Sequence, residues 1–185
     1  MSRRKRLERG NCGFDLRQIF NLTFIAQTPR FGNTWTNRFL GNWQLSPIVA
    51  YHTGTWFYAF AGVDNSLSGV FLDRPDVLGN PYVKSTTGAL QWLNPNAFAL
   101  SAPGTFGNSG RCSLLAPGYF NIDAAVSRYI NITERHRVEL RFEFFNLLNH
   151  PNFQAPDNYL SDATFGQILS DVGPRILQFA LKYTF

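Results

Sequence analysis

The chain has 185 residues, a length that suits one domain, and only 16% of them are charged, against about 25% in an average domain. Aromatic residues also reach 16%; a disordered chain would be poor in aromatics and rich in net charge, so disorder is excluded for most of the chain. Four of the five net positive charges fall within the first nine residues. The basic balance therefore belongs to a short arm, and nucleic acid is not an expected partner.

The N-terminal segment, residues 1–14, is predicted to be a basic, flexible arm. No apolar segment follows the charges between Ser2 and Arg9, so no signal peptide is expected. Cys12 and Cys112 are too few and too far apart for a disulfide framework or a zinc site. Whether these two cysteines pair with each other stays open.

The remainder of the chain, residues 15–185, contains five segments with the period of two that is typical of a β-strand with one apolar face, and a shorter aromatic run that is also predicted to be a strand. These segments cover residues 17–27, 42–53, 55–61, 119–131, 137–144 and 175–185. The alternation has no fault in 137–144, where Val138, Leu140 and Phe142 lie between charged residues. No amphipathic helix of three turns is expected. The chain is therefore predicted to be all-β.

The connections between these strands differ in length. Three are long and rich in Asn, Gly, Pro and Ser, at about 28–41, 62–118 and 149–173, whereas those at 52–55 and 131–136 are short. Successive connections of an antiparallel sheet lie at opposite ends, so this alternation predicts all long loops at one end. Outer-membrane barrels have such an arrangement. We expect a curved antiparallel up-and-down sheet of about six long strands, a fragment of a transmembrane β-barrel.

An alternating strand fits a soluble β-sandwich as well as a barrel. Several segments are about 11 residues long, as in membrane-spanning strands. Trp43 and Tyr51 are eight residues apart on one face, roughly 26 Å along a strand, which matches the ~25 Å apolar band between the aromatic girdles of a barrel. These two residues are therefore predicted to mark the membrane interfaces.

The two faces are predicted from the alternation alone. The apolar face should contain Leu45, Val49, Phe120, Ile122, Leu140, Phe142, Phe179 and Leu181. The opposite face should contain Gln44, Asp123, Arg137, Glu139, Arg141 and Glu143. Charges in mid-strand suit a water-filled lumen, and the apolar face should then be uncovered because lipid is its partner.

The C-terminus carries the most specific pattern. Phe185 is the last residue, and Tyr183, Leu181 and Phe179 precede it at every second position. This pattern resembles the C-terminal signal of bacterial outer-membrane barrels, which the barrel-assembly machinery reads. By that resemblance, these four residues form the assembly signal.

With these segments together, the chain resembles the C-terminal part of a TonB-dependent receptor of the Oar-like group, whose members carry a carboxypeptidase-regulatory-like domain. The resemblance is carried by RQIFNLTF, GNWQLS, WLNPNAF, APGTFGNSGR, ERHRVELRFEFFNLLNHPNF and the tail PRILQFALKYTF. It implies a location in the bacterial outer membrane. The implied partners are outer-membrane lipid, the remaining barrel with its plug, the barrel-assembly machinery and TonB. About six strands fall short of the smallest barrel, of about eight, so this chain is not expected to transport alone.

No catalytic, cofactor or metal site is predicted, and the chain is not expected to be an enzyme. His52, His136 and His150 lie far apart in the sequence. Asp73 and Asp76 could bind a hard cation, but the other ligands of a calcium loop do not follow.

The alternative function is a secreted, soluble β-sandwich module that binds carbohydrate, with the Trp92 loop as a stacking platform. Such a module would stay monodisperse without detergent, whereas a barrel fragment would not.

Overall fold

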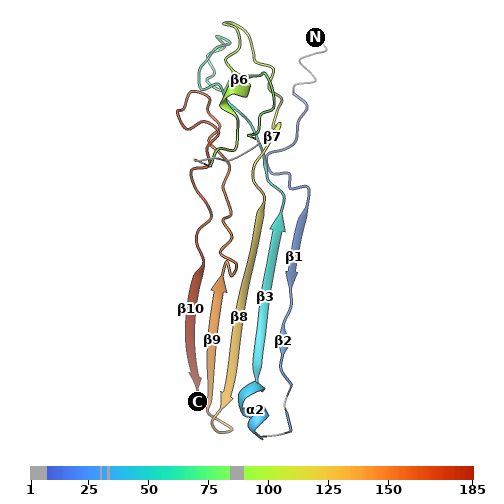
Figure 1. Ribbon diagram of the computed structural model, residues 1–185, viewed down its shortest axis with the longest axis vertical. Coiled ribbons are helices and arrows are strands. Elements are labelled where there is room, and N and C mark those ends of the chain that lie inside the picture. The colour runs from blue at the N-terminus through green and yellow to red at the C-terminus, as the bar shows by residue number, and fades with distance from the viewer. Residues whose placement is uncertain (1–7, 30, 33, 84–89) are drawn as a thin grey trace. The chain divides into compact units, whose positions relative to one another are not determined.

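The computed structural model describes residues 8–29, 31–32, 34–83 and 90–185, shown as a ribbon in Figure 1. The chain divides into two compact units. We call Gln18–His52, Tyr119–Asn152 and Gly173–Phe185 the strand unit, and Met1–Arg17, Thr53–Gly118 and Phe153–Val172 the loop unit.

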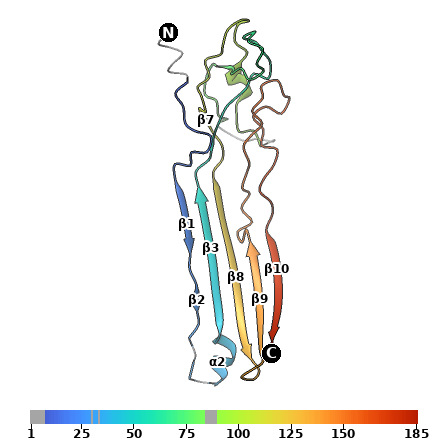
Figure 2. The ribbon, with the colours of Figure 1, turned by 180° about the vertical axis from the view of Figure 1, so that it is seen from behind.

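The strand unit is one six-stranded antiparallel sheet. Its strands are β1 (Ile19–Thr23), β2 (Ala26–Gln27), β3 (Trp43–His52), β8 (Tyr119–Asn131), β9 (Arg137–Phe145) and β10 (Ile176–Thr184). The spatial order is β1-β3-β8-β9-β10, and β2 also pairs with β3. Figures 1 and 2 show these strands side by side from the front and from behind. The predicted up-and-down antiparallel sheet is therefore confirmed.

The long strands match the span of a membrane. β3 has 10 residues, β8 has 13, and β9 and β10 have 9 each, against about 9–11 for a tilted transmembrane strand. In the described part of the chain, β1 and β10 pair on one side only. The sheet is therefore open at both edges.

One predicted strand, 55–61, is wrong. Only Trp56–Phe57 forms a strand there (β4), and it pairs in the loop unit with β7 (Leu114–Leu115) instead of joining the sheet. The reason lies at Gly54, where an added Cβ would stand 1.7 Å from the Ala116 carbonyl oxygen. Because the backbones meet so closely, the chain leaves the sheet after β3 and forms no hairpin at 52–55.

This change also corrects the predicted placement of the loops. The connection after β3 runs from residue 53 to 118, and the connection between β9 and β10 covers 146–175. Both connections begin and end at the same end of the strands, where His52 pairs with Tyr119 and Phe145 pairs with Ile176. The 28–42 connection lies at the opposite end, with the 132–136 turn, so the three long loops do not share one end. We call these the loop end and the turn end.

The turn end also contains a helix, α2 (Thr34–Leu40), which the sequence did not predict. It has only seven residues, too short for an apolar period to stand out from the sequence. No helix in the described residues is long and apolar enough to cross a membrane.

The loop unit has a small core of its own. Its buried apolar residues are Ala59, Leu93, Ala97, Phe98, Leu114 and Phe165. The 3₁₀ helix η1 (Pro95–Ala97) begins at Asn94, whose side chain accepts a hydrogen bond from the Asn96 N–H, and leads into β6 (Phe98–Ala99). β6 pairs with β5 (Asp76–Val77). This unit is built from turns and two-residue strands, and it contains no helix of three turns in the described part of 62–117.

Two features of the N-terminal segment belong to the loop unit. Glu8 forms an ion pair with Arg74, while residues 1–7 of the predicted arm lie outside the described residues. Cys12 is exposed and Cys112 is buried, and the two thiols are free.

Candidate functional site

The apolar face of the sheet follows directly from the strand register. Leu45 lies opposite Val126, Val126 opposite Phe142, and Phe142 opposite Phe179. The same register places Phe20 and Leu22 of β1 in line with this face. The predicted apolar residues therefore share one face: Leu45, Val49, Phe120, Ile122, Leu140, Phe142, Phe179 and Leu181.

The large side chains of this face are not covered. Leu45 is 41% exposed, Phe142 40%, Phe179 57% and Leu181 62%. Burying apolar surface stabilises a protein by about 25 cal/mol per Å², so a continuous exposed face of this kind marks a membrane or partner surface.

Aromatic residues stand at both ends of this face. At the loop end, Tyr51 lies opposite Phe20 and Phe120. At the turn end are Trp43, the first residue of β3, and Tyr183 of β10. This is the arrangement expected of two interfacial girdles, and the girdle role of Trp43 and Tyr51 stays a prediction.

The opposite, polar face carries the predicted charged residues. Glu139 lies opposite Lys182, and Arg141 forms an ion pair with Glu143 at 2.8 Å. A hollow of about 220 Å³ lies between Glu139, Arg141, Ala180 and Lys182. The register places all six predicted polar residues on this face: Gln44, Asp123, Arg137, Glu139, Arg141 and Glu143. Alternating charges keep water at this surface, as in a barrel lumen.

A polar junction ends β9 at the loop end of this face. The Asp123 carboxylate accepts hydrogen bonds from the Asn146 N–H at 2.9 Å and the Asn121 side-chain amide at 2.8 Å. Asn146 has a φ of +52° and exchanges hydrogen bonds with the His150 backbone. Asn is among the few residues that adopt this conformation readily, so Asn146 breaks the strand and turns the chain.

The C-terminal aromatic residues contact one another. The Tyr183 and Phe185 rings are 5.8 Å apart, and the Phe185 side chain is exposed. The Tyr183 hydroxyl lies 2.6 Å from His136 Nδ1, in the β8–β9 turn. The structure brings together His136 and the last strand, which sequence reasoning kept apart. The assembly role of Phe185, Tyr183, Leu181 and Phe179 stays a prediction.

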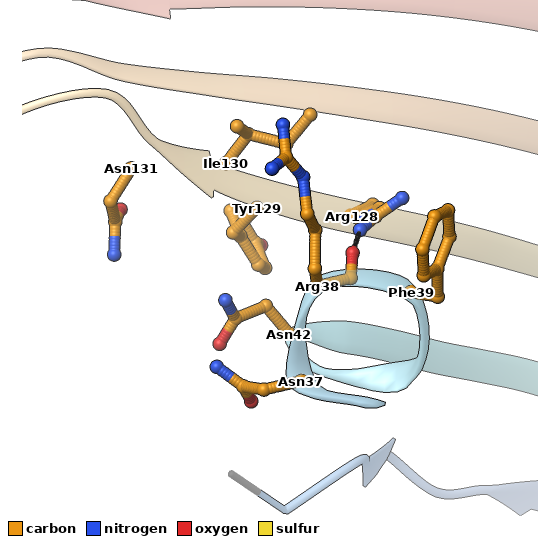
Figure 3. Close-up of a pocket in the computed structure, with 8 residues that line it drawn as sticks. All are labelled: Asn37, Arg38, Phe39, Asn42, Arg128, Tyr129, Ile130 and Asn131. Carbon is orange, nitrogen blue, oxygen red and sulfur yellow. Dashed lines mark hydrogen bonds between the residues drawn. The ribbon is translucent and has the colours of Figure 1, made fainter. Parts of the chain in front are cut away.

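A cavity at the turn end was missed by sequence reasoning. It measures about 700 Å³. Figure 3 shows its lining residues, which come from α2, from Asn42 just before β3 and from the end of β8: Asn37, Arg38, Phe39, Asn42, Arg128, Tyr129, Ile130 and Asn131. The sequence contains one signal of this cavity: Arg128 places a charge at a position of β8 where the alternation calls for an apolar residue.

The candidate ligands of the loop unit have structural partners. Asp73 accepts hydrogen bonds from the Ser66 N–H at 2.7 Å and the Ser66 hydroxyl at 2.9 Å, and Asp76 accepts one from the Asn108 N–H. Within the described residues, no three His, Cys, Asp or Glu side chains are grouped so that they could hold a metal ion.

Two further side chains of the loop unit are also engaged. The Trp92 indole N–H donates to the Leu115 carbonyl at 2.9 Å, and its ring meets Tyr82 edge-on, which does not fit an open stacking platform for carbohydrate.

Desolvation raises the pKa of Asp64, but hydrogen bonds from the Gly69 and Ser68 N–H groups and from the Ser66 and Ser68 hydroxyls lower it below its usual value.

The comparison with protein families gives one match that spans almost the whole chain. The model of a family described as outer membrane beta barrel domain matches residues 1–178. No curated protein and no solved structure matches the chain.

Proposed function

Because the chain belongs to the outer membrane beta barrel domain family, we propose that it forms part of the barrel wall of a TonB-dependent receptor of the Oar-like group. The family places the protein in the bacterial outer membrane. In this proposal the chain contributes wall strands and extracellular loops to the uptake of a ligand.

The observation that carries the proposal is the division of one sheet into an uncovered apolar face and a charged face. An apolar face suits lipid, and a face with Glu139, Arg141, Glu143 and Lys182 suits a wet lumen or a polar plug. A ligand channel needs both surfaces in the same strands.

The connections support the extracellular part of the proposal. The two longest, 53–118 and 146–175, both start and finish at the loop end. Outer-membrane barrels have short periplasmic turns and longer extracellular loops, so we assign the loop end to the outside of the cell. The loop unit, with its own core, would then meet the ligand.

Active uptake needs partners beyond these strands. We propose that the open edges of β1 and β10 pair with the remaining barrel, that a plug fills the lumen, and that TonB supplies energy. The C-terminal pattern ending at Phe185 would be read by the barrel-assembly machinery. We propose no catalytic role and no cofactor.

The test uses the whole outer-membrane protein that carries this sequence. We expect the immobilised periplasmic domain of TonB to retain the purified protein, and we expect the protein to be closed in a planar lipid bilayer because a plug fills it. A porin-like barrel would conduct ions steadily and would not be retained by TonB, and that result would overturn the proposal.

A further inference from the structure

The apolar face contains one charged residue among the described strands of the sheet. Arg128 lies opposite Trp43 on β3 and Leu140 on β9, so its side chain belongs to the face that contacts lipid. A charge there is costly at the centre of a bilayer and is tolerated near its interface. Arg128 stands at the level of Trp43, near the turn end, where an interfacial position is expected.

The Arg128 guanidinium is held in place but not neutralised. It lies over the Trp43 ring, 5.1 Å from the centroid, and donates to the Arg38 carbonyl oxygen at the end of α2. Its Nε is buried and has no hydrogen-bond partner in the described part of the chain. Trp43 is fixed in turn, because its indole N–H donates to the Phe39 carbonyl at 2.9 Å.

A second guanidinium faces the same space. Arg38 and Arg128 both line the 700 Å³ cavity, with the side chains of Asn37 and Asn42. In Figure 3, Arg38 reaches from α2 toward Ile130 of β8, while Arg128 lies beside Phe39. Among the described residues, none that lines the cavity is acidic, and neither arginine forms an ion pair with any of them. The cavity is therefore suited to an anion.

An apolar hollow lies beside Trp43, the residue whose ring contacts Arg128. It measures about 490 Å³. Trp43, Leu45, Val126 and Ala26 contribute to its wall, and the register places all four on the same face as Arg128. Phe39, which lines the cavity, and its neighbour Leu40 are also exposed. The cationic cavity and the apolar hollow are thus neighbours through Trp43, whose ring contacts Arg128 of the cavity and lines the hollow.

We propose that this site holds an anionic phospholipid of the periplasmic leaflet. The phosphate would lie between the Arg38 and Arg128 guanidinium groups, whose planar forks match phosphate oxygens, and the Asn37 and Asn42 amides would add hydrogen bonds. One acyl chain would occupy the hollow beside Trp43.

The placement in the leaflet follows from the short β8–β9 turn at this end, since short turns of outer-membrane barrels are periplasmic. The proposal requires an outer-membrane sheet in this orientation and does not require TonB or ligand uptake. The TonB test above and the lipid test below can therefore fail separately.

The experiment measures lipid retained by the whole outer-membrane protein that carries this sequence, purified in detergent. The probes are phosphatidylglycerol, phosphatidylcholine of the same chains, lipid A and the soluble anion glycerol 3-phosphate, each quantified by native mass spectrometry. We expect phosphatidylglycerol to bind about fivefold or more above phosphatidylcholine, since each arginine near an anionic lipid is worth about that factor. Glycerol 3-phosphate should not displace it, because the apolar hollow also holds the lipid.

Two variants and a matched control locate the site. Arg38→Gln removes one guanidinium but keeps the backbone carbonyl that accepts from Arg128, and Arg128→Gln removes the other. Each should lower phosphatidylglycerol binding about fivefold. Arg135→Gln removes a charge from the turn at the same end, outside both cavities, and should change binding little.

Several outcomes would overturn the proposal. An equal loss in Arg135→Gln would mean a general charge effect, and equal binding of phosphatidylcholine would mean no anion site. Displacement by glycerol 3-phosphate would mean a free-anion site, and stronger binding of lipid A would place this end in the outer leaflet. Should Arg128→Gln fail to give heat-modifiable barrel, Arg38→Gln decides the matter, since it leaves the Arg128 contacts in place.

Discussion

Replacing Ala124 by lysine should destabilise the sheet in a bilayer by about 2–4 kcal/mol, the cost of a basic side chain on the lipid face near the bilayer midplane. Ala124 lies between Pro47 on β3 and Phe144 on β9, and Pro47 is halfway along the apolar face between Trp43 and Tyr51. A loss of 2–4 kcal/mol corresponds to a change of roughly 30- to 1,000-fold in the unfolding equilibrium.

The control is the neighbouring residue. Ala125 lies on the polar face, opposite Glu143 on β9, so Ala125→Lys places the same new charge in the lumen next to a carboxylate. We expect this variant to change the free energy of unfolding by less than about 1 kcal/mol, as exposed charge pairs do.

The measurement is urea unfolding of the whole outer-membrane protein in lipid vesicles, followed by tryptophan fluorescence and by heat-modifiable mobility. Ala124→Lys should lower the urea midpoint clearly below that of Ala125→Lys. Equal midpoints, or the reverse order, would refute the assignment of the two faces and with it the membrane orientation of the sheet.

Three more predictions test other parts of the molecule. Deleting Phe185 should reduce the amount of heat-modifiable barrel in outer-membrane fractions several-fold, while removing three residues from the 62–117 connection should not; equal insertion after both deletions would contradict the assembly role. Gly54→Ala should open the loop unit to protease, because its Cβ would stand 1.7 Å from a backbone oxygen, whereas Gly79→Ala has no neighbour within 4 Å and should be silent. Hydrogen bonds hold the pKa of Asp64 below its usual 3.8 in the folded loop unit. The ionised carboxylate therefore stabilises the folded unit at pH values above 3.8, and this stabilisation is lost as the pH falls through the lowered pKa. The protection of the 66–69 amides against hydrogen exchange, taken relative to the unfolded-chain rate at the same pH, should therefore fall at acid pH in the native protein. Asp64→Asn should show less of this pH dependence.

The sequence by itself determined the strands of the sheet and their two faces. In 137–144 every second residue is apolar and the rest are charged, and this period of two needs no knowledge of the neighbouring strands. In 175–185 every second residue from Leu177 to Phe185 is apolar or aromatic, and this also marks one face without knowledge of the neighbouring strand. Because side chains alternate strictly along any extended strand, the membership of Phe142 or Glu143 in a face is a local property.

Other features depended on which segments meet. The aromatic run at 55–61 has the local pattern of a strand, but its partner is Leu114–Leu115 in the loop unit, and Gly54 is pressed against Ala116. Short apolar runs of this kind are ambiguous from sequence alone. As a result the placement of the long loops was predicted wrongly, since it depended on that strand.

The lipid site was decided entirely by tertiary structure. Arg128 and Arg38 are 90 residues apart in the sequence. The β3–β8 register sets Trp43 opposite Arg128. The carbonyls of α2 then lie at the same end, where Phe39 accepts from the Trp43 indole and Arg38 accepts from Arg128. Taken alone, Arg128 is one charged residue that interrupts an apolar alternation. Its surroundings exist only once three segments have been brought together by backbone pairing, and a local period carries no information about which strands pair or where a seven-residue helix comes to lie.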